Sequence, residues 1–584
     1  MKKEKSVILP ECESTDKLVD KFNSYFVDKI KPIRNELGSD NPTSVLNEPA
    51  AKDQLQCFRE IPPDTVYKYI KTASSATCGL DPLPTWILKC CLDTLNPVIT
   101  KIVNLSLTSG IFPERLKSVI ITLVIKISHL DKNELKSYRP VSNIPFLSKI
   151  IEKAAIEQIS NHMTENDMHE PFQSAYRKNF STETALLRIT NDILMDIDRR
   201  RGVILVLLDL SAAFDTIDHT ILAQRFEHRI GIKDTALSWI QSYHSDRIQR
   251  VSIGGIMSDA VVLECGGPQG SLMGAEDYKA YTLPVGDIIR KHNLRFKIYA
   301  DDTQIKISFD VKDKCDITVS IGLISECVAD IKSWMTANML KLNADKTEVM
   351  FITAPQYSAE MDICSIDIGG ADVMPVKSAR NIGVIFDDTL SFSAHITAVC
   401  RQCLYHIRNI AMIRKYISKE ACESLIHAMI TSRIDYANSV LAGVPQSELS
   451  RLQRIQNMAA KVIFQKRRYD HVTPLMMELH WLPIKERIDF KLLMFTHKAI
   501  FGEAPGYIKE LVTLYVPPRR LRSMDNPNLL VVPRYRTERY GARAFSSVAP
   551  RLWNALPPSI RTEQNFEVFK KLIKTHYFKA VYDL

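Results

Sequence analysis

Residues 294–309 read LRFKIYADDTQIKISF and contain two adjacent acids between two short apolar patterns. Phe296 and Ile298 alternate with polar neighbours before the central acids, and apolar residues alternate again after them. A period of two on both sides of a short interruption predicts a β-hairpin with Asp301 and Asp302 at its tip. Two like charges side by side repel each other, and a divalent cation removes that conflict because it prefers carboxylate oxygens. The stretch therefore predicts a hairpin that presents a candidate metal site.

A third carboxylate follows a second predicted strand. Residues 203–208 read VILVLL, a continuous apolar run typical of a strand buried on both faces, and Asp209 follows it directly. An Asp-Asp pair alone is also common in solvated loops. Three carboxylates on neighbouring strands of one sheet, however, are the ligand set of a two-metal phosphoryl-transfer site. The candidate catalytic and metal-binding residues are therefore Asp209, Asp301 and Asp302.

Length and composition describe an ordinary globular protein. The chain has 584 residues, 45% of them hydrophobic and 24% charged, and on the length prior it holds about three or four domains. No apolar run approaches the roughly 18 residues that a membrane span needs. The segment before Pro10 does not resemble a secretory signal. We expect an intracellular protein of the nucleus or cytoplasm that does not enter a membrane.

One cysteine pair invites a metal hypothesis. Cys400 and Cys403 have metal-ligand spacing, with His395 and His406 nearby. A second Cys or His pair at usable spacing is missing from the sequence, and the segment is predicted to be helical. The interpretation that we favour over zinc is that these are buried, reduced thiols.

The net charge of +9 is unevenly distributed. Residues 391–584 hold 30 basic and 15 acidic residues, whereas residues 1–390 hold 46 and 52. Lys and Arg gain affinity for phosphates by releasing counterions, so the last third predicts a nucleic-acid partner. A solvated basic surface is the alternative for each cluster. The candidate nucleic-acid-binding residues are Lys466, Arg467, Arg468, Arg519, Arg520 and Arg522, and a further basic cluster comprises Arg534, Arg536, Arg539 and Arg543.

The remaining periodicities predict a mixed chain whose last third is mostly helical. Helices are expected at 16–31, at 62–110 around a loop at 79–84, and at 147–163, 319–339, most of 395–501, and 566–582. Strands are expected at 116–127, 349–353 and 381–386.

Several short motifs carry a family resemblance. The strongest are LDLSAAFD at 208–215, PQGS at 268–271 and YADD at 299–302. Further motifs, in order along the chain, are SYRPVS at 137–142, FQSAYR at 172–177, N-x-x-K-T at 343–347, IGV at 382–384 and LHWLPI at 479–484. Together they resemble the reverse transcriptases of LINE-type, non-LTR retrotransposons, most densely from about 107 to 387.

This resemblance implies an α+β, right-hand polymerase fold, with fingers, a palm built on an antiparallel sheet, and a helical thumb. The expected parts are an N-terminal helical extension at 1–106, fingers and palm at 107–387, a helical thumb-like region at 388–500 and a basic C-terminal region at 501–584. The implied activity is an RNA-directed DNA polymerase that adds dNTPs to a DNA 3′ end. Its implied partners are an RNA template and a DNA primer or target, and its cofactor is a pair of Mg²⁺ ions, with Mn²⁺ as a substitute.

The resemblance also assigns roles at the nucleotide site. Phe214 matches the bulky residue that excludes a ribose 2′-hydroxyl, and Gln269 with Gly270 matches the loop that contacts the incoming nucleotide and template. Arg177 and Arg139 match fingers residues near the triphosphate, and Lys346 matches a palm lysine that assists the leaving pyrophosphate. The alternatives are a core aromatic for Phe214 and ordinary surface ion pairs for Arg139 and Lys346.

The chain also departs from the family pattern. Many relatives continue after PQGS with Val-Leu-Gly-Pro and an apolar helix, whereas residues 272–279 here read LMGAEDYK. Residues 1–106 are too short for the endonuclease that autonomous elements carry, so we expect that domain to be absent. A second hypothesis is therefore a catalytically idle or co-opted nucleic-acid-binding remnant. The three intact acids favour the enzyme.

Overall fold

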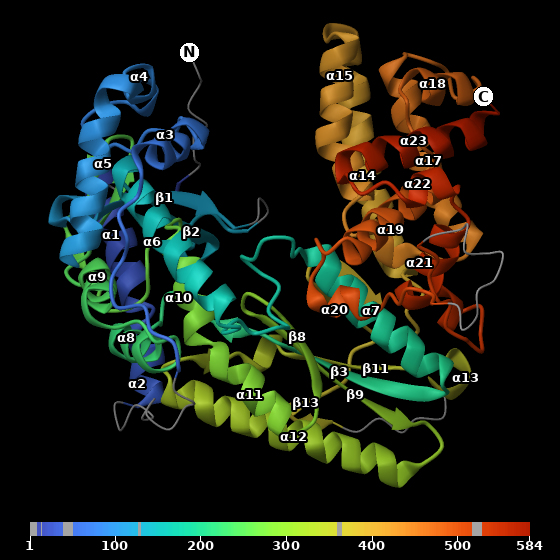
Figure 1. Cartoon of the computed structure of the whole chain (residues 1–584), viewed down its shortest axis with the longest axis horizontal. Coiled ribbons are helices and arrows are strands. Elements are labelled where there is room, and N and C mark those ends of the chain that lie inside the picture. Colours follow the sequence, from blue (N-terminus) through green and yellow to red (C-terminus); the bar gives the residue numbers. More distant parts are fainter. Residues whose placement is uncertain are drawn as a thin grey trace. The chain divides into compact units, whose positions relative to one another are not determined.

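The computed structural model describes residues 9–12, 14–38, 51–126, 130–358, 365–516 and 528–583 (Figure 1). Contacts divide the chain into two units, each assembled from several segments. The first unit comprises Met1–Glu170, Leu210–Lys291 and Ala329–Asn343, and the second comprises Pro171–Asp209, His292–Val328 and Ala344–Leu584. Across the described residues, we find no helix with the length and apolar character that crossing a membrane requires.

The first unit combines a small sheet with many helices. Its described helices are α1 (Thr15–Asp28), α2 (Lys31–Leu37), α3 (Pro63–Thr72), α4 (Thr85–Cys90), α5 (Leu92–Ser109), α6 (Phe146–Glu165), α8 (His219–His228), α9 (Asp234–His244), α10 (Met273–Tyr281) and α11 (Leu283–Lys291). Its strands are β1 (Ser118–Ile125), β2 (Tyr138–Asn143), β4 (Leu210–Ser211), β5 (Ile248–Ile253), β6 (Ile256–Met257), β7 (Val261–Val262) and β10 (Lys341–Leu342).

The sheet of the first unit has the order β2-β1-β5-β6, with β7 also pairing with β5. Helix α1 packs on this sheet through one apolar face. Phe22 is fully buried there, and its ring lies 5.2 Å from that of Tyr138 on β2. The amphipathic pattern of the N-terminal segment thus produces the predicted helix and attaches it to the sheet.

The second unit holds the sheet of interest and the C-terminal helices. Its described helices are α7 (Thr182–Asp198), α13 (Pro355–Ser358), α14 (Ser393–Ile413), α15 (Lys419–Ile426), α16 (Ser432–Ile434), α17 (Gln446–Ile463), α18 (Thr473–Glu478), α19 (Ile484–Ile500), α20 (Gly506–Lys509), α21 (Phe545–Asn554), α22 (Pro558–Arg561) and α23 (Phe566–Tyr582). Its strands are β3 (Arg201–Leu208), β8 (Arg295–Tyr299), β9 (Asp302–Asp310), β11 (Glu348–Ile352), β12 (Ile366–Asp367), β13 (Asp372–Val373), β14 (Ser378–Asn381) and β15 (Val384–Asp387). Helix α12 (Lys314–Ala337) begins in this unit and ends in the first.

The main sheet of the second unit has the order β11-β3-β9-β8, and every pair in it is antiparallel. The apolar run at 203–206 is completely buried at the centre of the sheet, as its composition predicted. Strands β8 and β9 form the predicted hairpin around Ala300 and Asp301. The α+β prediction is confirmed.

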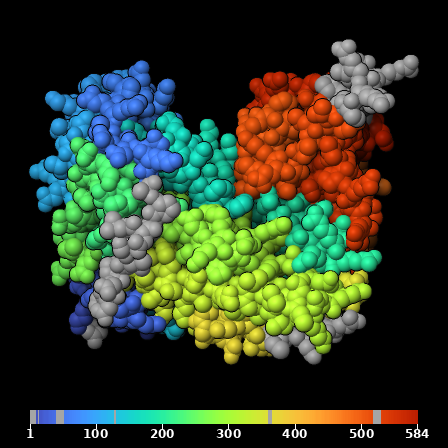
Figure 2. Space-filling model, turned by 60° about the horizontal axis from the view of Figure 1, so that its bottom comes forward, coloured from blue at the N-terminus to red at the C-terminus, as the bar shows by residue number. Residues whose placement is uncertain are grey.

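One apolar core joins this sheet to the C-terminal helices. Val203, Leu205 and Met350 of the sheet belong to the same buried cluster as residues of α7, α14, α17, α19 and α21. The space-filling view shows the C-terminal part, in orange and red, as a closely packed body of side chains (Figure 2). The sheet and these helices are therefore not separately packed layers.

Two local predictions are resolved by the structure. The strand expected at 381–386 is found only in part: Val384–Asp387 form β15, but Ile382 and Gly383 adopt positive φ and form the turn of the β14–β15 hairpin. The cysteines Cys400 and Cys403 lie on α14 with 9% and 0% of their surface exposed. The prediction that these thiols are buried is confirmed.

Candidate active site

The register of the main sheet gathers the three candidate carboxylates at one end. Leu208, the last residue of β3, pairs with Thr303 of β9, so Asp209 comes next to Asp302 at the start of β9. Tyr299 of β8 pairs with Asp302 across the turn, which leaves Asp301 in the turn itself. The acids that sequence analysis singled out are therefore neighbours, although 92 residues separate the first from the second.

The charges of these acids interact. The pKa of Asp302 is raised to about 6. Burial is the largest cause, and the negative charges of Asp301 and Asp209 contribute the rest. Nζ of Lys346 lies 3.4 Å from Oδ2 of Asp209, and 68% of the lysine side chain is exposed. A bound cation would relieve the mutual repulsion of the three carboxylates.

The donor set fits a hard divalent cation in type and in charge, because all three groups are carboxylates. The residues that the structure describes contain no group of three or more His, Cys, Asp or Glu side chains that already converges on one point. Asp209, Asp301 and Asp302 therefore fit a divalent cation by the chemistry of their side chains and by their proximity.

A buried glutamine holds the hairpin tip. Oε1 of Gln173 accepts hydrogen bonds from the backbone N–H of Ala300 at 3.1 Å and of Ala175 at 3.0 Å. Residues 172–174 run beside β8, because Ser174 N–H donates to Ile298 O and Ile298 N–H donates to Phe172 O. The motif around 172–177 therefore braces the turn that carries Asp301. The motif is recognisable in the sequence, but nothing in its local pattern marks Gln173 as a positioning residue.

Arg177 belongs to the same bracing segment. Its guanidinium stacks 4.1 Å above the ring of Phe180 and donates to Gln173 O at 3.3 Å. Tyr176, the preceding residue, is close enough to Asp301 for that charge to raise its pKa, after the larger effect of burial. Arg177 thus lies in the segment that contacts the hairpin, within the second unit.

The remaining nucleotide-site candidates lie in the first unit. Phe214 stands in a tight turn closed by a hydrogen bond from Asp215 N–H to Ala212 O, and Ala212 has φ of 52°. The ring of Phe214 stacks on that of Tyr278 of α10, with centroids 4.5 Å apart and planes 28° apart. The side chain of Phe214 is only partly buried.

Gln269 and Gly270 form a loop held by its neighbours. Nε2 of Gln269 donates to Oδ1 of Asp215 at 2.7 Å, and Gln269 O accepts from Ser142 N–H at 2.8 Å. Gly270 has φ of 133°, and a Cβ there would lie 2.7 Å from Ser142 O. Arg139 is exposed on β2, in the same strand as Ser142.

The unusual segment after this loop forms helix α10 and buries its charges. Lys279 pairs with Glu276 at 2.7 Å, and Asp277 lies 3.4 Å from Nε2 of His244. All four side chains are at most 5% exposed. The charges of Lys279 and Glu276, which an apolar helix would lack, are compensated by their ion pair inside the fold.

The basic candidates of the last third differ in where the structure places them. Lys466, Arg467 and Arg468 are exposed in the loop after α17, next to Tyr469, whose surface is 89% exposed. Arg519, Arg520 and Arg522 lie outside the described residues. Arg543 is buried and donates to Ala442 O and Leu390 O, so it is a structural residue.

Part of the chain matches a known protein family. Residues 130–386 match the family model for reverse transcriptase (RNA-dependent DNA polymerase). A probable RNA-directed DNA polymerase from transposon BS of Drosophila melanogaster is 25% identical over 66% of this chain and 42% of its own length. The RNA-directed DNA polymerase from the mobile element jockey of the same fly is 24% identical over 55% of this chain and 34% of its own length.

A probable RNA-directed DNA polymerase from transposon X-element, also of Drosophila melanogaster, is 23% identical over 62% of this chain and 39% of its own length. The chain thus spans less than half the length of these curated relatives. The antiparallel sheet with its terminal acids and the matched domain together confirm the right-hand polymerase class predicted for the fold. Residues 130–386 therefore match a reverse transcriptase domain, and the chain is similar to the RNA-directed DNA polymerases of these mobile elements.

Proposed function

We propose that the chain is the RNA-directed DNA polymerase of a non-LTR retrotransposon, adding dNTPs to a DNA 3′ end on an RNA template. The observation that carries the proposal is the meeting of Asp209, Asp301 and Asp302 at one end of an antiparallel sheet. Loops and sheet ends positioned by a rigid scaffold are where catalytic groups usually lie.

The proposed metal ligands are these three carboxylates. Two Mg²⁺ ions, or Mn²⁺, bound there would activate the attacking 3′-hydroxyl and neutralise the departing pyrophosphate. The raised pKa of Asp302 supports this assignment, because crowded carboxylates favour a cation. Lys346, paired with Asp209, is proposed to lie near the leaving pyrophosphate, and Arg177 near the triphosphate.

Within the first unit, Phe214 is proposed to exclude a ribose 2′-hydroxyl, with Tyr278 supporting its ring. The Gln269–Gly270 loop would contact the incoming nucleotide and template, and Arg139 the triphosphate region. The parts of the polymerase are proposed as the N-terminal extension at 1–106, fingers and palm at 107–387, thumb at 388–500 and basic region at 501–584.

Primer extension on an RNA template with dNTPs and Mg²⁺ tests the activity. We expect extension by the wild-type chain and a loss of several orders of magnitude in Asp301→Asn, which keeps the size of the side chain but removes its charge. Filter binding of the same RNA–DNA hybrid should be similar for both proteins. Equal background extension by both, with binding retained, would indicate the idle, co-opted remnant instead.

The exposed loop at 466–469 is proposed to contact the nucleic-acid backbone, because it combines three cations with an exposed aromatic ring. Replacing Lys466, Arg467 and Arg468 by alanine should weaken hybrid binding at all sequences. The slope of log affinity against log salt should decrease by about two to three. An unchanged slope would contradict this role.

A further inference from the structure

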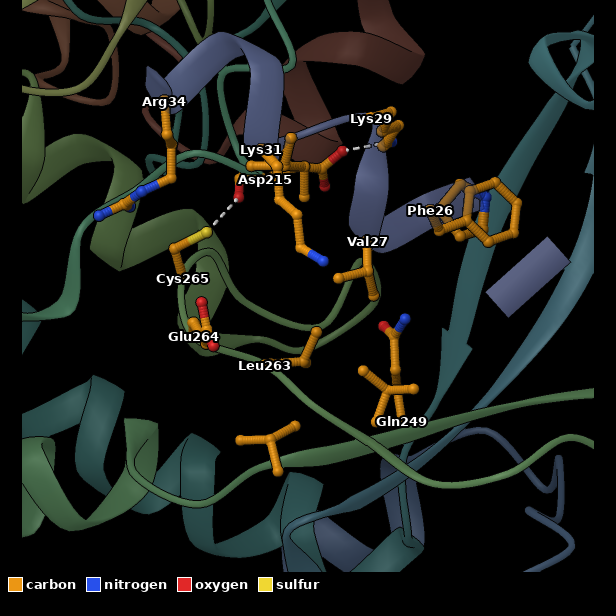
Figure 3. A pocket seen from close by; sticks show the side chains of 14 residues that line it. Phe26, Val27, Lys29, Lys31, Arg34, Asp215, Gln249, Leu263, Glu264 and Cys265 are labelled. Carbon is orange, nitrogen blue, oxygen red and sulfur yellow. Dashed lines mark hydrogen bonds and ion pairs between the residues drawn. The ribbon is translucent and has the colours of Figure 1, made fainter. Parts of the chain in front are cut away.

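The N-terminal helix α1 ends beside the loop that carries Gln269. It is fixed on its sheet by apolar packing and by a buried hydrogen bond, in which Nε2 of Gln249 donates to Oδ1 of Asn23 at 3.1 Å. Lys29, at the C-cap of α1, lines a cavity of about 260 Å³ together with Asp215, Lys31 and Cys265 (Figure 3). A rigidly attached helix therefore places one lysine at a defined point.

One carboxylate joins this helix to the loop. Nζ of Lys29 lies 2.7 Å from Oδ2 of Asp215, an ion pair drawn in Figure 3. Oδ1 of the same Asp215 accepts the hydrogen bond from Nε2 of Gln269, also at 2.7 Å. The two side chains of the ion pair are 26% and 13% exposed, so the contact is largely shielded from solvent.

The loop backbone is held independently of these side chains. Gly266 N–H donates to Ile217 O at 2.8 Å, and a Cβ on Gly266 would lie 2.7 Å from Asp215 O. At the other end Ser142 N–H donates to Gln269 O. With the backbone fixed at both ends, what Asp215 controls is the orientation of the Gln269 amide.

An ionised carboxylate can only accept hydrogen bonds, whereas an amide can donate with its nitrogen and accept with its oxygen. Asp215 therefore selects the rotamer in which Gln269 turns its NH₂ group toward the carboxylate and keeps its oxygen for another partner. The ammonium of Lys29 binds the other oxygen of Asp215 and so fixes the position of the carboxylate that Gln269 meets. The amide orientation is thereby set from α1.

We propose that Lys29 and Asp215 are positioning residues for Gln269. Helix α1, which carries Lys29 at its C-cap, would thereby contribute to nucleotide binding. Helix α1 lies before residue 130, where the family match begins. The inference rests on the proposed function, because it assigns these residues to nucleotide binding by the polymerase. It also predicts that Gln269 uses its amide oxygen to accept a hydrogen bond from the incoming nucleotide.

A second ion pair supports a fixed geometry. Nη2 of Arg34 on α2 lies 2.8 Å from Oδ2 of Asp218, which in turn caps α8 by accepting from Thr220 N–H and Ile221 N–H. The N-terminal segment is thus attached at two points to the turn that follows Phe214. Both attachments span more than 180 residues of sequence.

The test measures steady-state dNTP incorporation by the full chain. Asp215→Asn keeps the size of the side chain but can both donate and accept, so the Gln269 amide is no longer held in one orientation. We expect KM for the dNTP to rise about tenfold or more, in line with the loss of a charged hydrogen bond. KM for the primer–template should not change. Lys29→Met should act in the same direction, and Lys29→Arg should retain wild-type values.

A charge exchange separates positioning from plain stability. In Lys29→Asp with Asp215→Lys the ion pair is restored, so the melting temperature should be close to that of the wild type. KM for the dNTP should stay raised, because a lysine at position 215 can only donate to Gln269. Recovery of both melting temperature and KM would show that the pair is merely structural and would overturn the proposal.

Lys31→Met is the matched control. Lys31 lines the same cavity, but it is exposed and pairs with Asp28 of α1 at 2.9 Å. It should leave KM for the dNTP unchanged. If the wild type extends primers and Asp215→Asn behaves like Lys31→Met, the positioning role fails while the proposed function stands. If the wild type itself does not extend primers, the proposed function fails and this inference with it.

Discussion

At the scale of single residues, the hairpin tip depends on Gln173 as much as on its own sequence. Ala300 has φ of 55°, a left-handed conformation that costs an L-residue about 1–2 kcal/mol. The hydrogen bond from Ala300 N–H to Oε1 of Gln173, a side chain that is 4% exposed, helps to offset that cost, and a second bond from Ala175 N–H to the same oxygen fixes the glutamine. Asp301 is thereby held in place by a side chain more than a hundred residues away.

Gln173→Leu should therefore lower the free energy of unfolding by about 2 kcal/mol, because buried N–H groups lose their acceptor. Amide hydrogen exchange at Ala300 should accelerate, and primer extension should fall. Gln304→Leu is the matched control. Gln304 is a buried glutamine of β9 that bonds to Asn381 in the same unit rather than to the tip. If both variants exchange equally at Ala300, Gln173 does not brace the turn.

A buried acid in α19, Asp489, is expected to make the stability of the folded chain depend on pH. Burial raises the pKa of Asp489 to about 6, Lys485 at 3.9 Å lowers it only in part, and Glu486 adds to the increase. The folded state thus binds a proton more tightly than the unfolded chain does. The stabilisation by this proton is complete below the unfolded pKa, near 4, and is lost as pH rises through about 6.

We expect Asp489→Asn to be more stable than the wild type at pH 7.5, by up to about 2 kcal/mol, and equally stable near pH 4. Urea denaturation at the two pH values measures this difference. A constant difference between the two proteins across that range would exclude a raised pKa for Asp489.

At the scale of elements, the β14–β15 hairpin shows where local pattern misleads. Residues 381–386 are apolar enough to predict one strand, yet Gly383 has φ of 85° and reverses the chain. The hydroxyl of Tyr436 donates to Ile382 O at 2.8 Å and fastens the turn to the C-terminal helices. The turn is specified by glycine and by a tertiary contact together.

Gly383→Ala should destabilise the chain by more than the roughly 1–2 kcal/mol of positive φ alone. The added Cβ would lie 3.0 Å from the Tyr436 ring. Gly255→Ala is the comparison, because Gly255 has nearly the same φ, 87°, with nothing within 4 Å of its Cβ. Thermal denaturation of both variants measures the difference. Equal losses would mean that the ring moves aside without cost.

At the scale of the whole molecule, the main sheet and the C-terminal helices depend on one core. Ile189 and Ile193 of α7, Val203 of β3 and Ala549 of α21 belong to one buried cluster. A chain that ends with the matched domain at residue 386 would expose the sheet side of that cluster to water. The candidate acids stand at one end of that sheet.

Removing residues 501–584 should therefore increase proteolysis and hydrogen exchange in β3 and β9. Removing only residues 566–584 should have a smaller effect on those strands, because Phe569 and Ile573 pack in a separate cluster around Trp553. Exchange measured by mass spectrometry on both shortened chains compares the two. Unchanged protection of β3 in the longer deletion would show that the sheet is stable by itself.

The sequence by itself determined the hairpin, the buried strand before Asp209 and the helical last third, because each depends on local periodicity. The motif order also brought Asp209, Asp301 and Asp302 together as candidates. Only the tertiary structure decided that Gln173 braces Ala300, that Asp215 joins Lys29 to Gln269, and that Arg543 is buried rather than exposed. These contacts connect residues about 50 to more than 180 positions apart. No local pattern in the sequence encodes which distant groups come into contact.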